Sequence, residues 1–324
     1  MRNRSFAVVV ATVFLAGCTE ERDVAPAAQA SGPEPEELAS VLLPEVIVAE
    51  RAGFIPEGIE YDTANGRILT GSLTEGSIFQ IHVDGRVTTV VSDPDLVSSI
   101  GIEVDEPRNR LLVANSDRSV FEGTGRGQAK LGVYDLETGD RIAMVDLAAT
   151  IANPPADAAY FANDVAGAAD GTAYVTDTRM NVIYRVDTDY RASVFYQFRA
   201  VEGLGLNGIV VHPEGYLLVA GGTTLWKVPL DDPGSASQVT LPEVLPGQDG
   251  MVWMADGRLA IVSNSGNRVV ALTSADDWAT GELAGVAPYE TQATTAATIG
   301  DNIYVIHPHF ADADPPSVER VTFR

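Results

Sequence analysis

The sequence predicts an all-β fold, a six-bladed β-propeller. Three observations lead to this prediction: helical periodicity is scarce, short Val/Ile/Leu/Tyr runs bounded by Gly, Asp and Asn recur along the chain, and a unit of about 43 residues repeats. Repeats of this length that hold several strands each are typical of propeller blades. Two separate β-sandwiches are the alternative, but the repeat continues through any midpoint at which a boundary would fall. One domain over residues 45–324 is therefore expected.

Each repeat begins with an apolar strand that leads into a tight turn. Most of the turn residues tolerate the positive φ of a hairpin. The turns are Asn65-Gly66, Arg108-Asn109, Asp170-Gly171, Glu214-Gly215, Asp256-Gly257 and Gly300-Asp301. The second strands that follow are expected at 67–70, 110–113, 172–175, 216–219, 258–261 and 302–305. Third strands follow these, for example at 77–81 and 181–186.

The first strands can be aligned on one reference position. Residues equivalent to Gly58 are Gly101, Asp164, Gly208, Gly250 and one residue within 294–296. Their spacing is about 42 to 45 residues, except for 63 residues before the third repeat. A closed ring needs one blade built from both ends of the chain, because an unpaired edge would remain otherwise. The segment 46–49 is the candidate strand to complete the sixth blade beside 317–323.

The first 17 residues have the features of a secretory signal. Arg2 and Arg4 precede an uncharged run that is shorter than the ~20 residues needed to cross a bilayer. The run ends in Leu15-Ala16-Gly17-Cys18, which resembles the bacterial lipobox, where cleavage precedes a lipid-modified cysteine; an ordinary signal with a chance cysteine is the alternative. Cys18 is the only cysteine in the sequence. A lipidated Cys18 would exclude thiol catalysis and Cys-bound zinc.

Residues 18–44 are rich in Glu, Ala, Pro and Ser without periodicity, which predicts a solvated tether after the lipidated Cys18. We therefore expect an extracytoplasmic monomer that acyl chains hold at a bacterial membrane, in the periplasm or at the cell surface. The formal net charge is −24, and Lys130 and Lys227 are the only lysines. Nucleic-acid binding is not expected, because no basic face is available to contact phosphates.

Four of the six first strands begin with a side chain that carries an oxygen ligand: Glu57, Asn163, Asn207 and Asp249. In a closed ring of equivalent strands, these side chains point at one spot on the axis. A hard cation such as Ca²⁺ accepts carboxylate and amide oxygens together, with waters in the remaining positions. Zinc would usually need His or Cys, and none occupies these positions. Turn formation by Asn or Asp before Gly is the alternative for each residue alone, but it explains four equivalent positions poorly.

In a propeller blade the first strand lines the channel and the second returns outward, so first-strand starts and second-strand ends lie on one face. The second-strand ends add His307, His309 and three residues expected to line the substrate pocket, Asn115, Asp177 and Asn264. Two insertions, 117–130 and 148–161, are expected to rim the channel mouth as lids. Both histidines are candidates for an acid–base role, since imidazole titrates near neutral pH; structural loop histidines are the alternative.

At these residues the chain resembles the senescence-marker-protein/gluconolactonase family of six-bladed propellers, which are related to diisopropyl fluorophosphatase and the paraoxonases. The resemblance covers about residues 45–324. It is carried by Pro56-Glu57-Gly58, Phe161-Ala162-Asn163-Asp164-Val165, Asn207-Gly208-Ile209 and Asp249-Gly250.

The resemblance implies a catalytic divalent ion, Ca²⁺ or another, surrounded by Glu57, Asn163, Asn207 and Asp249. The implied activity is metal-dependent hydrolysis of a small lactone or related ester. In this scheme the ion polarises the substrate carbonyl and stabilises the oxyanion, while Asp249 or a nearby group activates water. Asn163 belongs to both the metal-binding and the catalytic set.

The chain departs from the family pattern at Phe161. Sugar lactonases of this family carry an arginine at this place, two residues before the third-blade asparagine, as a contact for sugar hydroxyls. An apolar residue there favours a lactone or ester less polar than an aldonolactone. Two alternatives stay open, because fold alone does not determine function. They are a non-catalytic binding propeller with a structural metal, and phosphotriester hydrolysis at the same metal.

Overall fold

Six tight turns join the first and second strands of the repeats, and each contains a residue with positive φ. In the structure, a computed structural model that describes residues 43–199, 201, 203–310 and 313–324, these φ angles lie between +48° and +92°. The residues concerned are Gly66, Asn109, Gly171, Gly215, Gly257 and Gly300. The turn prediction is therefore confirmed.

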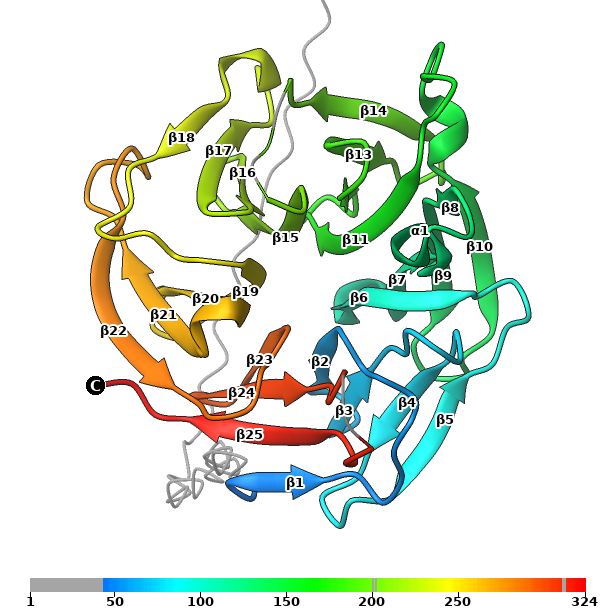
Figure 1. Ribbon diagram of the computed structural model, residues 1–324, viewed down its shortest axis with the longest axis vertical. Coiled ribbons are helices and arrows are strands. Elements are labelled where there is room, and N and C mark those ends of the chain that lie inside the picture. Colours follow the sequence, from blue (N-terminus) through cyan, green and yellow to red (C-terminus); the bar gives the residue numbers. More distant parts are fainter. Residues whose placement is uncertain (1–42, 200, 202, 311–312) are drawn as a thin grey trace, which may run out of the picture. The chain divides into compact units, whose positions relative to one another are not determined.

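The strands between these turns form six small sheets arranged in a ring, the predicted six-bladed β-propeller (Figure 1). Blade 1 consists of β2 (Ile59–Asp62), β3 (Arg67–Thr70), β4 (Ile78–Ile81) and β5 (Val87–Val91). Blade 2 consists of β6 (Ser98–Asp105), β7 (Arg110–Ser116), β9 (Lys130–Asp135) and β10 (Arg141–Asp146). Blade 3 contains β11 (Tyr160–Gly167), β12 (Ala173–Asp177), β13 (Val182–Val186) and β14 (Ala192–Gln197). A short strand, β8 (Gly127–Gln128), runs parallel to β11 as a fifth member of blade 3.

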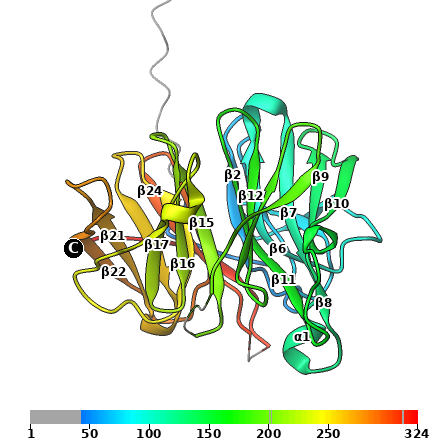
Figure 2. The same cartoon turned by 90° about the horizontal axis from the view of Figure 1, so that it is seen from above.

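Blades 4 to 6 have four strands each. Blade 4 consists of β15 (Leu206–His212), β16 (Tyr216–Gly221), β17 (Thr224–Pro229) and β18 (Ser237–Val239). Blade 5 consists of β19 (Gln248–Trp253), β20 (Leu259–Ser263), β21 (Arg268–Thr273) and β22 (Glu282–Pro288). Blade 6 consists of β23 (Ala296–Ile299), β24 (Asn302–His307), β25 (Ser317–Val321) and β1 (Val46–Val48). The helical segments are α1 (Ser119–Glu122), η1 (Glu106–Arg108), η2 (Ala148–Thr150), η3 (Pro233–Ser235) and η4 (Asn264–Gly266). Helix α1 projects from one face of the ring (Figure 2).

The ring is closed by the two ends of the propeller, as predicted. Strand β1 pairs antiparallel with β25, with Ile47 opposite Val318, and the two lie side by side at the outer edge of blade 6 (Figure 1). Pairing across this junction ties the first blade to the last and leaves no gap in the ring.

Neighbouring first strands touch backbone to backbone at the glycine positions that align the repeats. A Cβ added to Gly58 would lie 2.5 Å from the Ile100 carbonyl oxygen, and one added to Gly250 would lie 2.8 Å from the Thr295 Cα. The amide of Gly58 donates to the Ile100 carbonyl at 3.1 Å. Because Gly58, Gly101, Gly208 and Gly250 each make such a close approach to the next first strand, the residues just before these glycines are brought to the same level of the ring.

The hydrophobic core lies between adjacent blades. Leu112 and Val133 of blade 2, for example, belong to the same buried cluster as Val175 and Tyr184 of blade 3. These side chains come from the middle strands, which are buried on both faces because each blade packs against two neighbours. The packing of the blades leaves the axis to be lined by the first strands.

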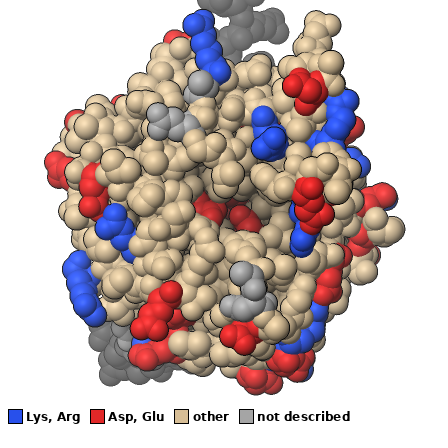
Figure 3. Space-filling view, in the orientation of Figure 1, with Lys and Arg blue, Asp and Glu red and all other residues tan. Residues whose placement is uncertain are grey.

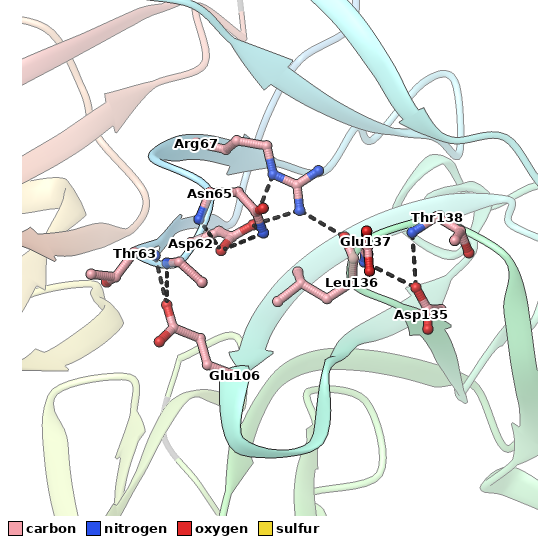
Figure 4. A network of polar contacts seen from close by, with 10 residues as sticks. Asp62, Thr63, Asn65, Arg67, Glu106, Asp135, Leu136, Glu137 and Thr138 are labelled. Atoms are coloured by element: carbon pink, nitrogen blue, oxygen red, sulfur yellow. Dashed lines mark hydrogen bonds and ion pairs between the residues drawn. The ribbon is translucent and has the colours of Figure 1, made fainter.

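On the side where the first strands end, the turns of blades 1 and 2 are joined by polar contacts (Figure 4). The buried Asp62 accepts a hydrogen bond from the Arg67 Nε at 2.8 Å, and the same guanidinium donates to the Leu136 carbonyl at 2.6 Å. Glu106 accepts hydrogen bonds from the backbone amides of Thr63 and Ala64. These contacts fix the inter-blade angle at the end opposite the predicted ligand residues.

Two predictions concern the N-terminal segment. The signal sequence and Cys18 lie outside the described residues, as does the tether up to residue 42. Within the described part of the chain, no helix has the length and apolar character needed to span a membrane.

Candidate functional site

The four predicted ligand residues line one cavity of about 650 Å³ in the middle of the ring. Glu57, Asn163 and Asp249 are each less than 10% exposed, at 8%, 6% and 7%, and Asn207 is half-buried. Seen down the axis, acidic side chains lie at the bottom of a central hollow whose surroundings are mostly uncharged (Figure 3). The structure therefore brings together four residues that are up to 192 positions apart in the sequence.

Three of these residues occupy β-bulges at the starts of their strands. The pairing register shifts between Ala162 and Val165 in β11, between Leu206 and Ile209 in β15, and between Gln248 and Met251 in β19. Asn163, Asn207 and Asp249 lie inside these three intervals. A bulge inserts one extra residue and redirects the side chains beside it, which is why bulges are common next to functional sites.

The amide of Asn163 is held in one orientation. Its Nδ2 donates to the Thr178 Oγ1 at 2.8 Å, and that hydroxyl in turn donates to the Leu206 carbonyl at 2.7 Å. The hydroxyl proton is already used, so Thr178 can only accept from Asn163. The opposite atom, Asn163 Oδ1, is buried and has no hydrogen-bond partner among the described residues.

A relay of two amides holds Asp249. Gln292 Nε2 donates to Asn264 Oδ1, and Asn264 Nδ2 donates to Asp249 Oδ2 at 2.9 Å. The other carboxylate oxygen, Asp249 Oδ1, is buried without a hydrogen-bond partner in the described part of the chain. The amide of Asn207 lies near enough to lower the pKa of Asp249, although no hydrogen bond of normal geometry joins the two. Asn264 lines the cavity, as predicted.

The two carboxylates are buried close together without a basic partner among the described residues. Burial, followed by the nearby charges of Asp249 and Asp164, raises the pKa of Glu57. Burial also raises the pKa of Asp249 to about 7; the hydrogen bond from Asn264 lowers it and the charge of Asp164 adds to the increase. Both shifts show that the ionised forms lack a compensating positive charge.

This donor set fits a hard divalent cation. Two carboxylates, one amide oxygen without a hydrogen-bond donor and a second amide offer only oxygen ligands, the kind that Ca²⁺ accepts. The described residues contain no group of three or more His, Cys, Asp or Glu side chains placed to hold a metal, so the amide oxygens are essential to the set. A cation bound here would supply the positive charge that the two buried carboxylates lack.

Asp164, the neighbour of Asn163, has a structural role. Its side chain accepts hydrogen bonds from the amides of Val165 at 2.9 Å and Ile209 at 3.1 Å, and so connects blade 3 to blade 4. It lines a second cavity of about 250 Å³ with Glu60 and Glu103. Burial raises the pKa of Glu103 to about 8.

The cavity walls above the ligand residues are largely apolar. Phe161 lines the wall as predicted, and its ring meets that of Phe121 edge to face, with 4.8 Å between centroids. Phe121 belongs to α1, so the insertion 117–130 does rim the mouth. The insertion 148–161 contributes Phe161 alone to the lining. Its neighbour Tyr160 pairs instead with Gly127 in β8.

Two predicted pocket residues lie behind the wall. Asn115 accepts hydrogen bonds from the Val97 amide at 3.0 Å and the Gln128 side chain at 2.9 Å, and it does not line the cavity. Asp177 is fully buried and accepts from the Phe161 amide and the Tyr184 hydroxyl, both at 3.0 Å. Both residues reach the predicted face, but their side chains point into the blades and satisfy buried donors there.

The two histidines also lie outside the cavity lining. His307 is 1% exposed; its Nε2 lies 3.0 Å from Glu319 Oε2, and its Nδ1 lies 3.3 Å from the Gln292 carbonyl oxygen. His309 has a φ of +54° and is half-buried. The structure therefore does not support an acid–base role for either histidine at the cavity surface. His307 instead supports the segment that carries Gln292.

Several cavity residues were not predicted from the sequence. Thr178 and Gln292 orient the ligand residues, and Phe121, Leu204 and Phe310 form the apolar rim. The insertion length pointed to the region of Phe121. No sequence signal identified the other four.

No known family profile and no curated protein sequence matches the chain. Solved structures are similar. The allergen Mala s 1 of Malassezia sympodialis aligns over 87% of this chain and 97% of its own, with a TM-score of 0.70 and 17% identity. A luciferin-regenerating enzyme aligns over 86% of this chain and 94% of its own, with a TM-score of 0.61 and 14% identity. The gluconolactonase XC5397 of Xanthomonas campestris aligns over 86% of this chain and 89% of its own, with a TM-score of 0.57 and 14% identity.

At these identities the similarity shows the six-bladed propeller fold alone. The structural neighbours include a gluconolactonase and other propeller enzymes. Membership of the senescence-marker-protein/gluconolactonase family itself stays a prediction.

Proposed function

We propose that the protein is a metal-dependent hydrolase of a lactone or related ester. The cation, Ca²⁺ or another divalent ion, would be held by Glu57, Asn163, Asn207 and Asp249. The observation that carries the proposal is the pair of buried oxygens at the floor of the cavity, Asn163 Oδ1 and Asp249 Oδ1, for which the described residues provide no hydrogen-bond partner. The gluconolactonase among the similar structures supports the choice of reaction.

When bound, such a cation polarises a carbonyl group and stabilises the negative charge that develops on its oxygen. The chain's own residues supply the remaining requirements. Asn264 and Gln292 hold Asp249 in position, and we assign to Asp249 the uptake of the proton from the attacking water. Phe161 and Ile100 exclude bulk water from the floor, which strengthens the electrostatic interactions there.

A substrate panel tests this proposal. Lactones, aryl esters and phosphotriesters would be assayed with calcium, after chelation, and after calcium is restored. We expect hydrolysis of a lactone or ester that chelation abolishes and calcium restores. Hydrolysis of phosphotriesters alone would point to the other reaction at the same site. Calcium binding without any hydrolysis would favour the non-catalytic binding propeller.

Thr178→Val is expected to weaken calcium binding by about 10- to 100-fold, the usual effect of removing a hydrogen bond that orients a metal ligand. Valine keeps the shape of threonine but cannot accept the hydrogen bond from Asn163 Nδ2, so the orientation of Oδ1 is lost. Thr298→Val is the matched control, since the Thr298 hydroxyl donates to the Trp253 carbonyl at 2.8 Å away from the four ligand residues. Calorimetric titration of chelator-treated protein with calcium measures the difference. Equal affinities in the two variants would contradict the role of Thr178.

A further inference from the structure

The cavity has far more apolar wall than a small ring compound needs. Its volume of about 650 Å³ lies within the ~300–1,000 Å³ of sites that enclose drug-sized ligands. The polar ligand residues occupy the floor. The apolar part of the wall above them is formed by Ile55, Leu73, Ile100 and Phe161.

The mouth of the cavity collects exposed apolar side chains. Phe121 is 48% exposed, Leu204 74% and Phe310 43%, and all three line the same cavity. They come from three different parts of the ring: α1, the connection that precedes β15, and the segment that follows β24. A single exposed apolar side chain is ordinary, but several around one concave site indicate contact with an apolar ligand.

Phe121 is held firmly enough to form a wall before any ligand arrives. The Asp117 side chain accepts from the Ser119 amide at 2.9 Å, and Arg118 pairs with Glu122 at 2.7 Å along α1. The ring of Phe121 packs edge to face on Phe161, and the Arg179 guanidinium lies 5.8 Å from its centroid. A wall that is already ordered loses little entropy on binding.

The two charged side chains at the mouth form an ion pair, so they do not favour a charged ligand. Arg118 and Glu122 both line the cavity, and they neutralise each other in their ion pair. The part of a ligand that lies between α1 and Leu204 therefore meets apolar groups and a neutral pair. The lining favours an uncharged hydrocarbon group there.

We propose that the substrate carries an alkyl or acyl chain of several carbons, which lies against Phe161 and Phe121 and reaches the rim at Leu204 and Phe310. The inference rests on the proposed function, because it places the lactone or ester group at the floor beside Asp249. It adds that the chain, not a set of hydroxyl groups, determines which substrate is accepted.

The test compares chain-length series with two readouts. The first is kcat/KM for γ-lactones with 5-alkyl substituents of increasing length, in the presence of calcium. The second is Kd by calorimetry for the matching γ-lactams, which resist hydrolysis. We expect both kcat/KM and affinity to improve about 4-fold for each added methylene until the cavity is filled.

Two variants assign the effect to the rim. Phe121→Ala and Leu204→Ala are each expected to reduce the gain per methylene by at least half. Ile142→Ala, at a side chain of matching exposure (47%) on the outer strand β10, is expected to keep the wild-type gain. Phe121 and Leu204 are exposed enough for these variants to fold.

A Kd and kcat/KM that do not depend on chain length would overturn the inference, as would a wild-type gain in both rim variants. Lactam affinity that rises with chain length, without any lactone hydrolysis, would contradict the proposed reaction but support the apolar subsite. If Phe121→Ala instead releases the protein from phospholipid vesicles while lactam affinity is unchanged, the rim contacts a membrane. That result would contradict the proposal that the rim binds the substrate chain.

Discussion

Asp249→Asn is expected to lower kcat/KM for the hydrolysed lactone or ester by about 1,000-fold, because several kcal/mol of transition-state stabilisation depend on the cation and the base at this position. The substitution removes a charge and keeps the shape. Asn264 can still donate to the remaining oxygen, so the fold around the site should persist. Steady-state assays with saturating calcium measure the change.

The same variant has a second expected result that separates a chemical effect from misfolding. The pKa of Asp249 is raised from 3.8 to about 7 in the folded protein, chiefly by burial, so the metal-free fold loses stability as the pH rises from about 4 to 7, and the full loss is present at pH 8. Asparagine removes this charge. Without metal, the Tm of Asp249→Asn should therefore equal or exceed that of the wild type at pH 8.

The control for Asp249→Asn is Asp301→Asn, at an exposed turn residue between β23 and β24. It makes the same chemical change far from the cavity and should leave both activity and Tm unchanged. If Asp249→Asn retains full activity, Asp249 is neither a metal ligand nor the base.

Gly58→Ala is expected to lower the free energy of unfolding by about 3 kcal/mol, or Tm by roughly 6–12 °C. The new Cβ would lie 2.5 Å from the Ile100 carbonyl oxygen and 3.0 Å from the Gly101 Cα. Both are backbone atoms, so no side chain can move to relieve the clash. Blades 1 and 2 would have to separate, and Glu57 would be displaced from the floor.

The matched control is Gly281→Ala. The Cβ added there would meet the ends of the Leu241 and Leu272 side chains at 3.4 Å, which is ordinary van der Waals contact. Thermal unfolding of the two variants in parallel measures the difference. Equal Tm values would contradict the close approach of first strands on which the alignment of the site depends.

The sequence was sufficient to predict features set by local patterns that recur. Turn residues such as Asn65-Gly66 and the apolar strands around them repeat six times, so the blade number and the closing strand β1 followed. The same alignment identified the four ligand residues. They occupy equivalent positions, and the ring geometry leaves them only the axis to face.

Features that depend on contacts between distant residues were beyond such reasoning. The bulges at Asn163, Asn207 and Asp249 are visible only from the pairing of two strands. Asn115 and Asp177 were placed on the correct face by strand direction, but which way a side chain points at a strand end depends on local pairing. Phe121 lies in an irregular insertion, where no periodicity indicates the environment of a side chain.

The measurement that tests the central claim most directly is calcium titration by calorimetry, on chelator-treated wild-type protein and on the Glu57→Gln/Asp249→Asn double variant. The proposed site predicts binding at the cavity floor in the wild type and the loss of one ion per chain in the double variant, because two of its oxygen ligands have lost their charge. Wild-type stoichiometry and affinity in the double variant would contradict the claim that these residues form the metal site.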